Sequence, residues 1–204
     1  MLKFEKPTYK ITEYVENNNY GKFELEPLER GFGTTLGNAL RRVMLSSMPG
    51  SAIVAVKIDG VMHEFQTIEG VIEDVTTIIL NLKSVVLKNN TEEDKVLHLH
   101  ASKEGEVKAG DIETDADVEI INKDLVIATL AKGGKLDMEL IVSNGRGYVP
   151  SNENKKFIEN NKIGYIPIDA LYSPIERISY EVDTARVGQD ANYDKLILNV
   201  YTNG

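Results

Sequence analysis

Three glycines at the start of a helix-like segment are the first residues whose spacing suggests chemistry. Gly31, Gly33 and Gly37 read Gly-x-Gly-x-x-x-Gly where an apolar, helical periodicity begins, and the amide groups at a helix start attract phosphate. Neither phosphate fingerprint fits, because a dinucleotide loop has its third glycine one residue earlier and a P-loop continues as Gly-Lys-Ser or Gly-Lys-Thr. Two interpretations stay open: a nucleotide-binding loop, or a tight turn that lets the helix pack closely.

The histidines are the candidate metal ligands. His98 and His100 project from one face of an expected strand, which is compatible with a metal site. No third ligand lies nearby in the sequence, and a half-exposed strand face explains the pair better. The chain also has no cysteine, no nucleophile elbow, no HExxH and no paired-aspartate motif. We therefore expect no catalytic residue, no metal and no cofactor.

Two adjacent arginines stand inside the helical segment. Arg41 and Arg42 are about 100° apart on a helix, while Leu36, Leu40 and Val43 form the stripe that faces a core. At least one arginine must therefore face solvent or a partner. A single exposed arginine is usually solvated, whereas two beside a glycine run favour an interface, where arginine is enriched.

The composition is that of a globular chain of 204 residues, enough for one domain or two small ones. The formal net charge is −9, and residues 91–120 hold ten acidic residues against three lysines. The acidity is thus local, and there is no basic surface of the kind that binds duplex DNA. No apolar run is as long as a membrane span, and no secretory segment follows Met1. The sequence predicts a soluble, cytoplasmic protein.

Alternation and turn residues predict an α+β fold with few helices and mostly antiparallel strands. The first helix ends at Pro49 and Gly50, because the residue before a proline disfavours the helical region. The expected elements, in order, are two strands within residues 1–30 that meet at 17–19, a helix over 35–48, a hairpin of strands 52–58 and 61–65 turning at Asp59-Gly60, a helix over 69–83, short strands over 84–88, 95–101, 118–121, 125–130 and 136–142, an exposed loop over 152–162, and a two-stranded ribbon with strands at 178–182 and 196–200.

Five segments of the chain carry recognisable motifs. They are LEPLERGFGTTLGNALRRVMLSSMPG at residues 25–50, VKIDGVMHEF at 56–65, NGRGYVP at 144–150, DALYSPIER at 169–177 and DKLILNVYTNG at 194–204. In this order they closely resemble the amino-terminal domain of the bacterial RNA polymerase alpha subunit. Because the resemblance spans nearly the whole chain, a chance match is not credible.

The resemblance implies a two-part fold and a scaffolding function. Residues 1–49 and 175–204 would form a discontinuous dimerisation subdomain of antiparallel strands plus helices. Residues 50–174 would form an inserted, mostly antiparallel β subdomain carrying one helix. Two alpha subunits pair, one docking the beta and the other the beta-prime subunit of DNA-directed RNA polymerase, and catalysis belongs to the large subunits. The alternative is an independent phosphate- or nucleotide-binding enzyme built around residues 31–37, which calorimetry with nucleotides would distinguish.

The resemblance also assigns roles by position. Arg42 matches the arginine that docks the beta subunit, and the same surface contains Arg30, Gly31, Gly33, Asn38, Arg41 and Leu45. Lys83 matches a lysine implicated in the beta-prime contact, and a later docking segment contains Ile168, Asp169 and Arg177. The homodimer interface would contain Leu36, Leu40, Val43 and Met44.

Members of this family continue past the Thr-Asn-Gly segment with another helix, a linker and a small domain that touches upstream DNA. This chain stops at Gly204. We therefore expect no direct promoter contact from it.

Overall fold

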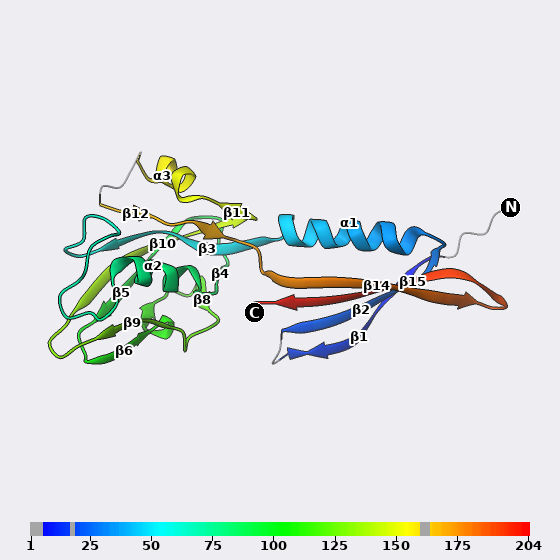
Figure 1. The fold of residues 1–204 in the computed structure, drawn as a ribbon, viewed down its shortest axis with the longest axis horizontal. Coiled ribbons are helices and arrows are strands. Elements are labelled where there is room, and N and C mark those ends of the chain that lie inside the picture. The colour runs from blue at the N-terminus through cyan, green and yellow to red at the C-terminus, as the bar shows by residue number, and fades with distance from the viewer. Residues whose placement is uncertain (1–5, 17–18, 160–163) are drawn as a thin grey trace. The chain divides into compact units, whose positions relative to one another are not determined.

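The computed structural model describes residues 6–16, 19–159 and 164–204. They form two compact units, residues 1–48 with 173–204 and residues 49–172. The described residues contain three α-helices and mostly antiparallel strands (Figure 1), so the expected α+β class is confirmed. Within the described ranges, no helix is both long and apolar enough to cross a membrane.

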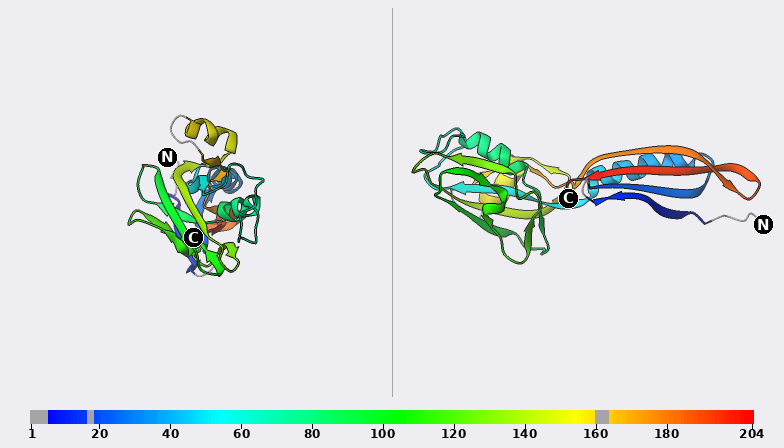
Figure 2. Two further views of the ribbon diagram at one scale, coloured as in Figure 1. Left: turned by 90° about the vertical axis from the view of Figure 1, so that its left-hand side faces the viewer. Right: turned by 90° about the horizontal axis from the view of Figure 1, so that it is seen from below.

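The first unit is a four-stranded antiparallel sheet with one helix. Its elements are β1 (Thr8–Val15), β2 (Tyr20–Glu29), α1 (Phe32–Ser47), β14 (Ile175–Val187) and β15 (Asp190–Thr202), with the strands in the order β1-β2-β15-β14. The two expected strands within residues 1–30 and the expected terminal ribbon are therefore confirmed. Of the expected turn between β1 and β2, residues 17–18 lie outside the described residues. Figure 2 shows α1 beside the β14–β15 ribbon from further directions.

The helix α1 rests on this sheet through its glycines. Gly33 and Gly37 are its only buried residues, and a Cβ at Gly37 would lie 2.5 Å from the Tyr180 ring. The helix begins at Phe32, three residues before the expected start, so Gly33 as well as Gly37 lies within the helix. A glycine is unfavourable inside a helix by about 1 kcal/mol relative to alanine, and close packing explains its presence here.

The second unit is built on a five-stranded antiparallel sheet. Its strands, in the order β12-β3-β10-β5-β7, are β12 (Ile166–Pro167), β3 (Pro49–Ile58), β10 (Leu136–Arg146), β5 (Lys95–Ala101) and β7 (Ile112–Glu113). Three small sheets pair β11 (Tyr148–Val149) with β13 (Ala170–Leu171), β4 (Leu87–Asn89) with β8 (Val118–Ile120), and β6 (Gly105–Lys108) with β9 (Val126–Leu130). The helices α2 (Val75–Lys83) and α3 (Ser151–Glu159) and the short turn η2 (Ala109–Asp111) complete the unit.

The core of the second unit is continuous between α2 and the sheet. The helix buries Val75, Ile78, Ile79 and Leu82. They join one cluster with the inward residues of β3, β5, β9 and β10, including Val56, Leu99 and Leu140. At about 25 cal/mol per Å2 of buried apolar surface, such a cluster is the main stabilising term of a domain of this size.

Two predictions around the first half of this unit are wrong. Residues 61–65 form no strand, because β3 already pairs with β10 on one side and β12 on the other. The second helix begins at Val75 rather than at residue 69. The Asp74 carboxylate accepts a hydrogen bond from the Thr77 amide at 2.8 Å and caps it there. The segment before it is held by β9 instead, through a bridge between Val71 and Leu130.

The expected exposed loop over residues 152–162 is wrong for residues 152–159, which belong to α3, while residues 160–162 lie outside the described residues. Its polar sequence shows no apolar stripe, and its burial depends on a side-chain amide. Asn154 is buried, and its Nδ2 donates to the Ile168 carbonyl at 2.7 Å. The Asp169 carboxylate accepts from the Ser151 amide at 2.8 Å and so satisfies the helix start. Both contacts come from a distant segment, so periodicity within α3 carries no trace of them.

Candidate docking surfaces

The N-terminus of α1 is held by a carboxylate from the far end of the chain. Gly31 precedes the helix at φ 89° and supplies no side-chain cap. Asp194 Oδ2 accepts from the Gly31 amide at 2.7 Å and from the Gly33 amide at 3.1 Å. Beside it, Arg30 Nη1 donates to Asn192 Oδ1 at 3.3 Å. A negative group at this position also interacts favourably with the positive end of the helix dipole.

This arrangement bears on the nucleotide-binding interpretation. A phosphate at the glycine run would need the amides of Gly31 and Gly33, which already donate to Asp194. The carboxylate is an intramolecular occupant of the anion position. The geometry therefore favours the packing role of the glycines over a nucleotide site.

The face of α1 that points away from the sheet is polar. Arg42 lies about 180° around the helix from Gly33, and Asn38, Arg41, Arg42 and Leu45 are all exposed. Neither arginine has a side-chain hydrogen bond or ion pair within the described part of the chain. Both guanidinium groups are thus free for a partner.

One flank of α1 is apolar and also exposed. Leu40 is 36% exposed and Val43 is 56% exposed, whereas Leu36 and Met44 are partly buried against the core of their own unit. The stripe expected from the sequence is therefore split between the core and an open flank. Phe32, which sequence reasoning did not single out, adds a 53% exposed ring to the same flank.

The sheet continues this apolar surface. Strand register places Tyr9 opposite Leu25, Ile11 opposite Phe23 and Tyr14 opposite Gly21, and Leu25 and Phe23 pack toward the core on the α1 side. The three β1 side chains therefore share that face of the sheet, yet they are 75%, 58% and 69% exposed in the order given. Apolar residues gathered in this way mark interaction sites.

A second candidate surface lies in the other unit, at the end of α2. Lys83 Nζ lies 2.8 Å from Asp169 Oδ2, and the other oxygen of this carboxylate accepts from the Ser151 amide. The Lys83 ammonium, followed by the Ser151 amide, holds the pKa of Asp169 below its ordinary value. Ile168 beside it is 1% exposed. The structure thus joins three of the residues assigned from the resemblance, while the fourth, Arg177, belongs to the first unit.

Arg177 lies on β14 and stacks on an aromatic ring. Its guanidinium carbon is 4.1 Å from the centre of the Tyr201 ring, a distance suited to a cation–π contact. The side chain is therefore oriented by its own unit and stays exposed.

Lys83 and Asp169 are among the residues that line a groove of about 190 Å3. Phe65 and Leu80 line it and are 80% and 55% exposed. Sequence reasoning missed both residues, because one was expected in a strand and the other lies outside the apolar stripe of its helix. An exposed leucine on a helix face was the only available signal for the groove.

The two histidines contact each other, and one of them contacts a carboxylate. His98 and His100 stack with ring centres 6.3 Å apart, and His100 Nδ1 lies 2.6 Å from Asp137 Oδ1. The hydrogen bond with Asp137 raises the pKa of His100. In the ranges that the structure describes, no three histidine or acidic residues are grouped in a way that could hold a metal ion.

Comparison with known proteins gives one consistent answer. Residues 56–173 match the family model described as the RNA polymerase Rpb3/RpoA insert domain. Over all 204 residues, the chain is 59% identical to the DNA-directed RNA polymerase subunit alpha of Symbiobacterium thermophilum. The subunits of the same name from Desulfitobacterium hafniense and Desulforamulus reducens are 56% and 57% identical over the same span. The chain covers 64% of the length of each of these curated relatives. It belongs to the bacterial RNA polymerase alpha subunit family.

Proposed function

We propose that the chain is a non-catalytic scaffold subunit of DNA-directed RNA polymerase. It pairs with a second copy through the first unit and docks the beta and beta-prime subunits through its exposed helix and groove. The observation that carries this proposal is the uncovered apolar face of the first unit, formed by one flank of α1 and by β1. A second copy of the chain is the simplest occupant, because symmetric homodimers are the commonest assembly of soluble subunits.

Cysteine crosslinking tests the homodimer, since the chain has no native cysteine. Val43→Cys places a thiol on the exposed apolar flank of α1, and Asn38→Cys places one on its polar face. We expect Val43→Cys to form a disulfide-linked dimer under mild oxidation and Asn38→Cys to stay monomeric on a denaturing gel. Met44 is a poorer reporter, because it packs against its own core. Equal crosslinking of the two variants would contradict the assignment of the flank.

Beta-subunit docking is assigned to the polar face of α1. Arg42 is exposed and free of partners within the described chain, so Arg42→Ala should leave the melting temperature within about 1 °C. An arginine that is desolvated at an interface contributes about 2 kcal/mol or more, which predicts a loss of binding of about thirtyfold in a pull-down with the beta subunit. Arg41→Ala is the matched control, because Arg41 lies about 100° away on the helix. A large fall in melting temperature for Arg42→Ala would make the residue structural instead.

Beta-prime docking is assigned to the groove that Lys83 helps to line. Leu80→Gln removes an exposed apolar side chain from the groove. Glutamine is also a good helix former, so the helix should be retained. We expect weaker capture of the beta-prime subunit, by about tenfold. Ile72→Gln is the control, because Ile72 is 71% exposed but does not line the groove. If both variants bind equally well, the groove takes no part in docking.

A further inference from the structure

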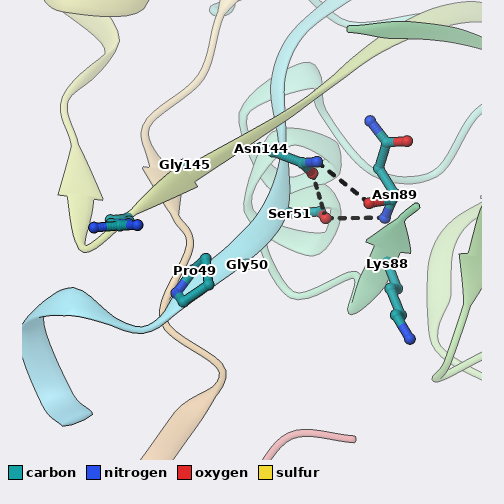
Figure 3. Close-up of a pocket in the computed structure, with 8 residues that line it drawn as sticks. Pro49, Gly50, Ser51, Lys88, Asn89, Asn144 and Gly145 are labelled. Carbon is teal, nitrogen blue, oxygen red and sulfur yellow. Dashed lines mark hydrogen bonds between the residues drawn. The ribbon is translucent and has the colours of Figure 1, made fainter. Parts of the chain in front are cut away.

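A pocket of about 430 Å3 in the second unit (Figure 3) has two cationic residues, Lys88 and Arg146, in its lining. It is lined by Pro49, Gly50 and Ser51 of β3, Lys88 and Asn89 of β4, and Asn144, Gly145 and Arg146 of β10. No acidic side chain is among these lining residues. Lys88 and Arg146 are both exposed, and neither has a side-chain partner in the described part of the chain.

The polar groups at the floor of the pocket satisfy one another. Ser51 Oγ donates to Asn144 Oδ1 at 2.6 Å and accepts from the Asn89 amide at 2.9 Å. Asn144 Nδ2 donates to the carbonyls of Asn89 and Thr91 at 3.2 and 2.7 Å. Because these donors are already used, the floor is rigid but offers little to a ligand. Recognition therefore falls to the two cationic side chains at its edges.

This local positive charge stands out against its surroundings. Residues 49–172 contain 21 acidic and 13 basic residues, and several lysines of the unit, such as Lys57 and Lys95, already lie within 4 Å of a carboxylate. Lys88 has one acidic cross-strand neighbour, Glu119 on β8. No ion pair joins these two side chains in the structure as described. The pocket thus attracts an isolated negative group, while the unit around it repels an extended polyanion.

The two cations come from two different strands. Arg146 lies on β10 as the register partner of Pro49, and Lys88 lies on β4, where the amide of its neighbour Asn89 donates to Ser51 of β3. A ligand with two negative groups can therefore meet each cation with one of them. The planar fork of an arginine pairs with a carboxylate through two parallel hydrogen bonds.

We propose that this pocket binds two carboxylates of an extended acidic segment from a protein partner. The segment crosses the start of β3 with one carboxylate on Lys88 and the other on Arg146. Nucleic acid is the less suitable ligand, because its affinity comes from many neutralised phosphates and this pocket supplies two cations in an acidic unit. The site is separate from the docking surfaces assigned above, and its test does not depend on them.

The binding test uses fluorescein-labelled peptides on the full 204-residue chain at low, constant ionic strength. Each peptide carries two glutamates separated by one, three or five glycines, which places the carboxylates about 7, 14 or 20 Å apart in an extended chain. Peptides with glutamine in place of glutamate are the neutral controls. We expect one glutamate spacing to bind at least tenfold more tightly than its glutamine counterpart, measured by fluorescence anisotropy. Equal affinity for the two peptides at every spacing would overturn the proposal.

Variants locate the site. Lys88→Gln and Arg146→Gln should each weaken binding of the glutamate peptide at least threefold. The double variant should bind the glutamate peptide no more tightly than the glutamine peptide. Glu119→Gln removes the competing carboxylate beside Lys88 and should strengthen binding. Lys132→Gln, at an exposed lysine outside the pocket, should change little. An equal loss in Lys132→Gln would show a general charge effect and refute the site.

A competition experiment separates carboxylate from phosphate. Inorganic phosphate and a short oligothymidylate are titrated against the bound glutamate peptide. The reference is the concentration at which the unlabelled glutamate peptide displaces the labelled one. We expect neither phosphate nor the oligothymidylate to displace the labelled peptide at ten times that concentration. Displacement by either at equal concentration would assign the pocket to phosphate groups and overturn the proposal. Unchanged far-ultraviolet circular dichroism of each variant provides the control for folding.

Discussion

The close approach of α1 to its sheet predicts that Gly37→Ala destabilises the first unit. The new Cβ would lie 2.5 and 2.8 Å from two ring carbons of Tyr180 and 2.9 Å from Leu196 Cδ1. All three distances are shorter than real contacts allow, and Leu196 is fully buried. The helix must therefore move outward or the Tyr180 ring must leave the core cluster against which it packs.

The magnitude follows from two opposing effects. Overpacking a closely fitted core costs about 1–3 kcal/mol, while replacing glycine by alanine inside a helix gains about 1 kcal/mol. Because the new Cβ would meet three atoms at less than 3 Å, we take the upper part of the overpacking range, about 2–3 kcal/mol, and expect a net loss of about 1–2 kcal/mol in the free energy of unfolding of the first unit. Asn38→Ala is the matched control, because it makes a similar gain in helix propensity at an exposed position of the same helix.

Hydrogen exchange is the suitable assay, because the two compact units need not unfold together. Peptides from α1, β14 and β15 should exchange about 5- to 30-fold faster in Gly37→Ala, while peptides from β3 and β10 serve as an internal reference and stay unchanged. The double variant with Tyr180→Leu should recover part of the loss, because the ring is the main obstacle. Unchanged or slower exchange in Gly37→Ala would show that the glycine is not needed for packing, and the reasoning would fail.

Three further predictions concern single carboxylates and one histidine. Asp194→Ala should destabilise α1 by about 1–2 kcal/mol through loss of its cap, measured by hydrogen exchange of the helix; unaltered exchange would remove the cap from the argument. The bond to Asp137 raises the pKa of His100, so its stabilising contribution is present below about pH 6.5 and disappears as the pH rises through the folded-state pKa. An NMR titration should show a lower His100 pKa in Asp137→Asn, and an identical titration curve would contradict this pairing. Lys83 lowers the pKa of Asp169. In urea unfolding, the wild-type chain should therefore be more stable than Asp169→Asn above about pH 4, and this difference should shrink as the pH falls through the folded-state pKa. A difference that does not change with pH would refute the linkage.

Local patterns in the sequence were sufficient for the elements that depend on neighbouring residues. The terminal ribbon, the strand over residues 95–101 and the existence of two helices before it follow from hydrophobic period and turn residues, which act over a few positions. The family could also be identified from the sequence, because its motifs are contiguous segments. Helical spacing alone also predicted that at least one of Arg41 and Arg42 faces away from the core.

The tertiary structure decided what depends on contacts between distant segments. The start of α1 is set by Asp194, 163 residues from Gly31, and α3 is held by contacts with Ile168 and Asp169 that no helical periodicity reveals. The same holds for the apolar stripe of α1, which the sequence predicts without saying which members are covered. Only the close fit of Gly33 and Gly37 against the sheet determines that Leu36 turns inward while Val43 stays open. Burial depends on what packs against a side chain, and that partner is chosen by the whole fold.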